Sequence, residues 1–133
     1  MKRLVSGVVF HEGRVLLVRR AAGEVLAARW TLPEGPMTPG VGWGPSLTEA
    51  IQRETGLLVN VLERTAIPYL AGPWPGVRAI AIPITQAPEI RLADRLDGYR
   101  WIPLCDLETV DGLAPGIVEE VVMALEAGIY GVV

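Results

Sequence analysis

Apolar residues occur in short runs along the chain, and residues typical of turns separate these runs. A Val-rich run at residues 4–10 and a second run at 15–18 flank the turn residues 11–14, and this pattern predicts two strands joined in a hairpin. Later apolar runs predict further strands over 29–32, 57–62, 65–70, 77–85 and 99–102. Pro83 lacks a backbone donor, so the far end of its strand is expected at an edge or a bulge.

Two segments instead have the apolar spacing and the end signals of helices. Ser46 and Glu49 form a Ser-x-x-Glu capping box, and Gly56 stands where a C-terminal cap belongs, which predicts a helix of about two to three turns. Pro115 and Gly128 delimit a second helix, whose acidic first turn suits the positive end of a helix dipole.

Proline and glycine mark the segments between these elements. Residues 33–45 hold four of each, so this segment is expected to be neither a helix nor a central strand. Residues 71–76 predict a loop that fixes Trp74 between two prolines, as a lid over a pocket or as a turn anchor. The order of strands, one helix, more strands and a final helix predicts an α/β protein with a mixed sheet and helices on both faces.

Length and charge narrow the class of protein. A chain of 133 residues without a break in composition predicts one domain over residues 1–133. Its apolar runs are shorter than the ~18–20 residues of a membrane-spanning helix and its start lacks a signal-peptide pattern, so a cytoplasmic protein without a membrane partner is expected. The net charge of −3 argues against a nucleic-acid partner, and the single cysteine, Cys105, excludes an internal disulfide. The apolar residues 129–133 predict packing on the domain or on a second subunit, in a homodimer.

Three stretches together resemble the Nudix (MutT-like) family of hydrolases, which cut nucleoside diphosphates linked to another group. Residues 7–20 resemble the opening hairpin of the family, Trp30-Thr-Leu-Pro-Glu-Gly35 resembles the entry to its signature box, and residues 99–107 resemble its late strand and turn. Because they occur in this order over nearly the whole chain, the resemblance implies the Nudix-like α/β/α sandwich with a mixed central sheet.

The signature box of the family is a glycine, five residues, a glutamate, seven residues, and then Arg-Glu-apolar-x-Glu-Glu-x-Gly-apolar. Aligned without gaps over residues 35–57, this chain keeps the spacing and only one of the glutamates, Glu54. The other charged positions carry Val41, Glu49, Ala50 and Arg53 where the family has Glu, Arg, Glu and Glu.

A second register aligns residues 46–54 with a Ser-x-x-Glu-Ala-x-x-Arg-Glu stretch of the family, with residues 41–44 as an insertion and the last helical turn deleted. The capping box favours this register, whereas Gly56 favours the ungapped one. In both registers Glu54 falls on a functional position, and neither register supplies a full set of metal ligands.

The glutamates of the family bind Mg²⁺ or Mn²⁺, which neutralise the diphosphate and activate the attacking water. The resemblance therefore implies catalytic roles for Glu54 and Glu49 and metal binding by Glu54 and Asp97, since the family draws a carboxylate from the region before the late strand. One surviving glutamate does not hold several ions, so hydrolysis is expected to be weak or lost, and the protein to need no metal unless it is active. Glu34, Glu49, Asp94 and Asp97 are candidate replacements for the missing ligands, and the more common role of each is that of a solvated acid in a loop or on a helix.

Arginines offer a second way to bind phosphate. Glu49 and Arg53 are four residues apart on the predicted helix and can pair, and Arg53 with Arg19 or Arg20 is a candidate to contact a diphosphate directly. Trp74 is a candidate to cover or stack on the ligand. Three functions stay open: a protein that binds a nucleotide-like ligand, an active nucleoside-diphosphate-X pyrophosphohydrolase with a rebuilt set of metal ligands, and a non-enzymatic dimeric interaction module.

Overall fold

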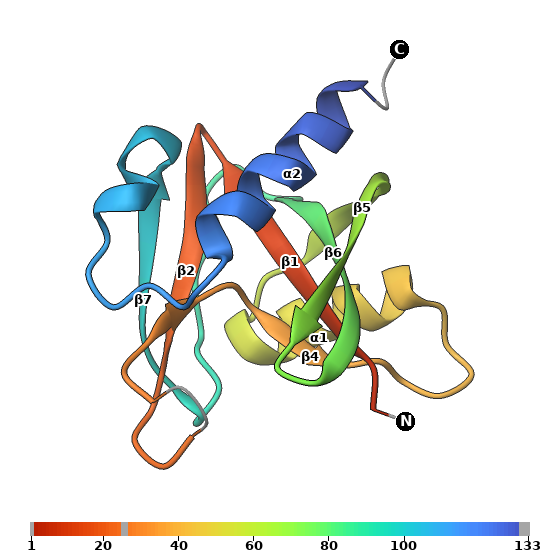
Figure 1. Ribbon diagram of the computed structural model, residues 1–133, viewed down its shortest axis with the longest axis horizontal. Coiled ribbons are helices and arrows are strands. Elements are labelled where there is room, and N and C mark those ends of the chain that lie inside the picture. Colours follow the sequence, from red (N-terminus) through yellow and green to blue (C-terminus); the bar gives the residue numbers. More distant parts are fainter. Residues whose placement is uncertain (1, 25–26, 131–133) are drawn as a thin grey trace.

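A computed structural model describes residues 2–24 and 27–130, with only the backbone of 128–130. The elements follow in the order β1 (Leu4–His11), β2 (Arg14–Arg20), β3 (Trp30–Thr31), β4 (Glu34–Pro36), α1 (Trp43–Thr55), β5 (Val59–Ala71), β6 (Trp74–Pro83), β7 (Leu96–Pro103), the 3-10 helix η1 (Leu104–Thr109) and α2 (Ile117–Tyr130) (Figure 1). Within the described residues, no helix has the length and hydropathy that crossing a membrane requires.

The strands form one mixed sheet in the order β3-β2-β1-β6-β5, in which β4 also pairs with β1 and β7 with β2. The central pair, β1 and β6, is parallel over the register Leu4↔Gly76 to Val9↔Ala81, and the other pairs are antiparallel. The predicted hairpin of β1 and β2 and the predicted mixed sheet are confirmed.

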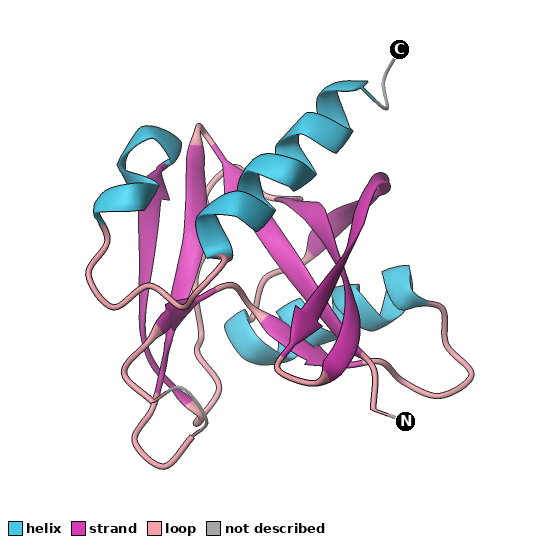
Figure 2. Ribbon diagram, in the orientation of Figure 1, coloured by secondary structure: helices cyan, strands magenta, loops and turns pink. Residues whose placement is uncertain are grey.

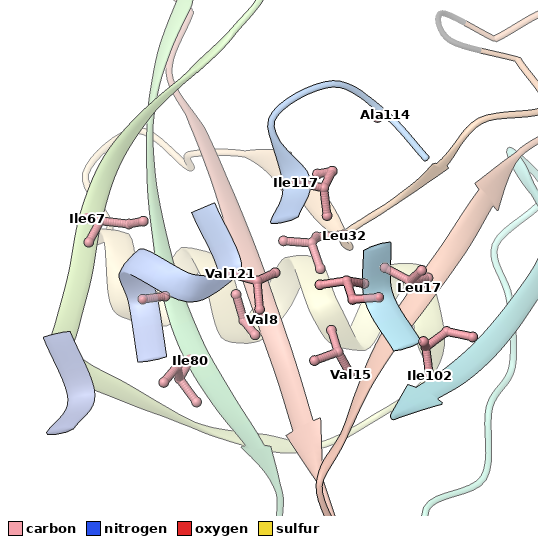
Figure 3. Close-up of a cluster of buried hydrophobic side chains, with 12 residues drawn as sticks. Val8, Val15, Leu17, Leu32, Ile67, Ile80, Ile102, Ala114, Ile117 and Val121 are labelled. Carbon is pink, nitrogen blue, oxygen red and sulfur yellow. The ribbon is translucent and has the colours of Figure 1, made fainter. Parts of the chain in front are cut away.

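The two helices cover opposite faces of the sheet (Figure 2). Val8 and Ile80 point to the face that α2 covers, where they belong to the same buried cluster as Ile117 (Figure 3). The neighbouring Val9 points to the other face and packs in a second cluster with Leu47 of α1. This alternation along β1 follows the two-residue period of a strand, and it confirms the prediction of helices on both faces.

The helix α1 begins at Trp43, ahead of the predicted start at Ser46. Its N-cap is Gly42, which makes no side-chain cap hydrogen bond, and the Ser46 Oγ accepts a hydrogen bond from the backbone N–H of Thr38 at 3.1 Å. The predicted capping box is therefore wrong, and the argument that favoured the gapped register is lost with it. Gly56 ends the helix in the left-handed conformation, with φ of 76°, as predicted.

Two segments expected to be loops contain strands. Residues 34–36 form β4 at the edge of the sheet, which agrees with the exclusion of a central strand. The segment 71–76 is a tight turn inside a hairpin, because Ala71 pairs with Trp74, so only Gly72 and Pro73 stand outside the ladder. The two strands predicted over 57–70 are one long strand, β5, with an irregular register between Leu62 and Ile67.

The last helix differs from its prediction at both ends. It begins at Ile117, two positions beyond the expected Pro115, and it runs through Gly128 instead of ending there. The side chains of residues 128–130 and all of 131–133 lie outside the described residues. The predicted packing of this apolar tail therefore stays a prediction.

Candidate functional site

A cavity of about 800 Å³ opens on the face of the sheet that α2 covers. Its lining comes from segments far apart in the sequence, and the polar and aromatic side chains that matter most are Arg20, Glu34, Tyr69, Trp74, Arg78, Arg95 and Glu120. Small-molecule sites in proteins have volumes of roughly 300–1,000 Å³. The cavity is therefore large enough for a ligand of nucleotide size.

The carboxylate of Glu34 joins two walls of the cavity. Its Oε1 accepts a hydrogen bond from Arg20 Nη2 at 2.6 Å, and its Oε2 accepts one from the Tyr69 hydroxyl at 3.2 Å. The Arg20 residue is 8% exposed. Burial first, and then the nearby Glu34 charge, raise the pKa of Tyr69 above its ordinary value. The hydroxyl is thus kept protonated as a donor.

Arg78 is the most buried cation of the cavity, at 2% exposure. Its guanidinium lies over the Tyr69 ring at 4.0 Å from the centroid, its Nε donates to Ser6 Oγ at 3.0 Å, and it forms an ion pair with Glu120. Burial lowers the pKa of Arg78, while Tyr69 and Glu34 act in the opposite direction. Arg78 was not among the residues predicted from the sequence, although a lone charge among the apolar residues of a strand is a usable signal.

Glu54 lies on the buried side of the last turn of α1 and is 3% exposed. One oxygen, Oε1, forms an ion pair with Arg95, and the other, Oε2, has no hydrogen-bond partner among the described residues. Nη2 of Arg95 also donates to the backbone oxygen of Glu34 at 3.0 Å. Arg95 lines the cavity, so it connects the carboxylate of Glu54 with that space.

Backbone hydrogen bonds fix the segment that carries Arg95. The N–H of Ala93 donates to the carbonyl of Glu54 at 3.0 Å, and the N–H of Arg91 donates to the carbonyl of Thr55 at 2.8 Å. On the other side, the carbonyl of Arg95 accepts from the N–H of Ala21 at 2.9 Å. The segment thus satisfies carbonyls at the end of α1 and ties it to the end of β2.

The residues proposed from the sequence fall in different places. Arg20 and Trp74 line the cavity, and Trp74 is 40% exposed. Arg19 and Asp97 do not line it, and they pair with each other at 2.7 Å with side chains 41% and 45% exposed. Asp97, a predicted metal ligand together with Glu54, therefore has a cation as its partner.

Glu49 and Arg53 are both exposed on α1 and are not among the residues that line the cavity. Their expected ion pair is not formed in this part of the described structure. Glu49 instead accepts a hydrogen bond from the Thr38 hydroxyl at 3.4 Å, and Arg53 packs toward Gly35, where an added Cβ would lie 3.0 Å from its Nη2.

The side chains around Glu54 do not form a binding site for a divalent cation. Mg²⁺ requires six oxygen ligands in octahedral geometry, several of them from carboxylates or water. Over residues 2–24 and 27–130, no three or more His, Cys, Asp or Glu side chains gather as a metal site would need. The partner of Glu54 is instead the guanidinium of Arg95, which carries the charge that a metal ion would bring.

Neither a protein-family model nor a curated protein matches the sequence. Solved structures do match. A NUDIX hydrolase from Nitrosomonas europaea superposes with a TM-score of 0.76 at 17% identity, over 98% of this chain and 73% of that chain. The chain has the Nudix fold.

Two further structures with the Nudix fold match at similar levels. An Ap4A hydrolase from C. elegans gives a TM-score of 0.75 at 15% identity, over 98% of this chain and 99% of that chain. A bifunctional NMN adenylyltransferase/ADP ribose pyrophosphatase from Francisella tularensis, complexed with AMP and a manganese ion, gives 0.71 at 17% identity, over 94% of this chain and 41% of that chain. Identities this low establish the fold, so the chemistry of the site must be argued from its own residues.

Packing in this Nudix-fold chain agrees with the replaced residues of the box. Ala50 is fully buried where α1 meets β4, and a Cβ added to Gly35 would lie 2.9 Å from the Ala50 Cβ. A Cβ at position 35 would therefore have to push the helix and the strand apart. The contact between α1 and β4 depends on small residues at these two positions.

Proposed function

We propose that this protein binds a nucleotide-like ligand through its phosphate groups in the cavity, with metal-dependent hydrolysis weak or absent. The observation that carries the proposal is the placement of Arg20, Arg78 and Arg95 in the walls of one large cavity. Arginine donates several N–H groups in a fixed plane and binds phosphate oxygens by paired hydrogen bonds. Each of the three has a carboxylate partner, so none carries an uncompensated charge before the ligand arrives.

Aromatic side chains support the nucleotide part of the proposal. Tyr69 and Trp74 lie on the two strands of one hairpin at the rim and wall of the cavity. Trp74 is 40% exposed, so a flat base or a sugar face can pack on its ring, whereas the Tyr69 ring is already covered by Arg78 and contributes its hydroxyl to the wall. The Francisella tularensis structure, in which 41% of the chain matches this fold, is complexed with AMP, a ligand of this class.

Weak hydrolysis follows from the same residues. Cutting a diphosphate depends on cations that stabilise the charge developing at phosphorus and activate a water molecule. Glu54 is the only glutamate that the ungapped box retains, and its charge is already matched by Arg95. The set of carboxylates that would hold several ions is not assembled around it within the described residues.

Binding can be measured by calorimetry and thermal shift with AMP, ADP-ribose and diadenosine tetraphosphate, each in EDTA and in Mn²⁺. We expect at least one ligand to bind in EDTA without release of mononucleotide. Arg20→Met should weaken that binding about tenfold or more, because hydrogen bonds to charged groups contribute roughly 1.5–3 kcal/mol. Arg19→Met is the matched control, since Arg19 directly precedes Arg20 in the same strand but lies outside the cavity lining.

The other outcomes lead to the alternative functions. Mn²⁺-dependent turnover that Glu54→Gln abolishes would establish an active hydrolase and refute the proposal. No binding of any ligand, with a dimer in sedimentation, would favour the interaction module. Equal losses in Arg19→Met and Arg20→Met would place the ligand outside this cavity.

A further inference from the structure

We propose that Arg95 replaces the metal ion in this Nudix fold. Its guanidinium neutralises Glu54 and offers its remaining N–H groups to a phosphate in the cavity, so that ligand binding is independent of divalent cations. The inference rests on the proposed function for the identity of the ligand, and on the contacts of Arg95 alone for the replacement of the metal.

The first support is the pairing of a buried acid with a partly exposed base. The Glu54 side chain is 4% exposed and the Arg95 side chain 35%. A carboxylate so far from water needs a cation beside it, because an unpaired charge in a protein interior costs several kcal/mol. Arg95 fills that need, while its exposed part stays within reach of the cavity that it lines.

The second support is the number of donors that Arg95 has left. A guanidinium carries five N–H groups. The two bonds of Arg95, to Glu54 Oε1 and to the backbone oxygen of Glu34, are both made by Nη2. Its Nη1 forms no hydrogen bond or ion pair with the described residues, whereas its unpartnered Nε is buried. Arg95 therefore retains donors for an anion after it has satisfied Glu54.

The third support is the fixed position of the Arg95 backbone. The hydrogen bonds from Ala93 to Glu54, from Arg91 to Thr55 and from Ala21 to Arg95 hold the segment on both sides. A cation held in advance loses little conformational entropy when an anion binds, which favours affinity. An arginine also keeps its charge over the whole physiological pH range, as a metal ion does.

A divalent ion would meet repulsion at this place. To reach Glu54 it would have to displace the Arg95 guanidinium or lie against it, and like charges at contact distance oppose each other. The chain offers no group of three acids within the described residues to offset that cost. The contacts around Glu54 thus favour the fixed organic cation over a bound ion.

Two measurements test this inference, and both use the intact chain. In the first, Mn²⁺ alone is titrated and followed by electron paramagnetic resonance, with wild type, Arg95→Met, Glu54→Gln and the double variant Arg95→Met/Glu54→Gln. We expect no bound Mn²⁺ in wild type, and weak binding in Arg95→Met, through Glu54 and water alone, that the double variant lacks. Mn²⁺ bound to wild type and lost in Glu54→Gln would overturn the inference, whether or not a nucleotide binds.

In the second, ADP-ribose binding is measured by calorimetry in EDTA and in Mn²⁺. Wild type should bind equally in both, within about twofold. Arg95→Met should bind about tenfold more weakly or worse, since a charged hydrogen-bond donor is lost. Arg91→Met, an exposed arginine in the same segment, should bind like wild type. If Arg95→Met does not fold, Arg95→Lys keeps a charge beside Glu54 and should still weaken binding, because lysine lacks the planar fork.

The failures of the two ideas can be told apart. No binding of ADP-ribose to wild type in either buffer refutes the proposed function, and the Mn²⁺ titration then decides on Arg95 by itself. Binding that Mn²⁺ strengthens tenfold, or an equal effect of Arg91→Met and Arg95→Met, refutes the role of Arg95.

Discussion

Removal of the Arg95 side chain should strongly destabilise the fold, because it leaves the Glu54 carboxylate buried without a cation. Loss of one partner from a buried ion pair costs about 3–5 kcal/mol. The Arg95 side chain is 35% exposed, so water can enter part of the space that it leaves. We therefore expect Arg95→Met to lower the free energy of unfolding by about 3 kcal/mol, the lower end of that range.

A double-mutant cycle isolates the pair from the rest of the contacts. Glu54→Gln leaves Arg95 free to turn its exposed part to water, so its cost should be smaller, about 1–2 kcal/mol. The double variant has no charge left to bury, and its loss should fall short of the sum of the single losses by at least about 1 kcal/mol. Urea unfolding at pH 7, with equal m-values as the condition for comparison, measures all four proteins.

The result that would refute this reasoning is additivity. If the losses of unfolding free energy in the two single variants add up to the loss in the double variant within about 0.5 kcal/mol, the charges of Glu54 and Arg95 do not stabilise each other. A loss in Arg95→Met no larger than that in Arg91→Met would have the same meaning, because the Arg91 side chain is exposed.

Two further predictions concern Tyr69 and the start of α1. The pKa of Tyr69 is raised in the folded protein, whereas in the unfolded chain it has the ordinary value near 10. The contribution of Tyr69 to stability is therefore complete below about pH 10. It is lost as the pH rises further, by at most about 1.4 kcal/mol per pH unit. Urea unfolding between pH 8 and 11 should show this slope, and Tyr69→Phe should reduce it; parallel curves would contradict the burial of the hydroxyl. Gly42→Asp should raise stability by about 0.5–1 kcal/mol in thermal or urea unfolding, because the extended N-cap lacks a side-chain bond and the first turn of α1 has no acid. Gly40→Asp, where φ is +77°, is the control and should not stabilise.

Local patterns predicted the elements of the fold well where a strand is buried on both faces. The runs that became β1 and β2 are apolar because both faces of these strands are covered, as Val8 and Val9 show on opposite sides of one strand. Gly56 was found because the left-handed end of a helix needs glycine. These features depend on residues that are neighbours in the sequence, so the sequence alone can predict them.

The errors arose where a distant residue changed a local preference. Ser46 has the pattern of an N-cap, but its hydroxyl oxygen accepts a hydrogen bond from the backbone N–H of Thr38. The helix starts a turn earlier, with Gly42 as its N-cap. Arg95 lies in a polar stretch with no local pattern of its own, and only the meeting of α1, β2 and β4 gives it a partner in Glu54. Contacts between residues far apart in sequence decide the site, and no short pattern contains them.

The parallel pairing of β1 and β6 has a consequence for the order of events in folding. Leu4 must pair with Gly76 for the two central strands of the sheet to form. Pairing between strands so far apart in sequence is slow, because a long loop has to close first. Glu120, which pairs with Arg78 in the lining of the cavity, lies later still in the chain. A ligand can therefore recognise only the nearly finished molecule, so it should lengthen the lifetime of the native state without accelerating the search that leads to it.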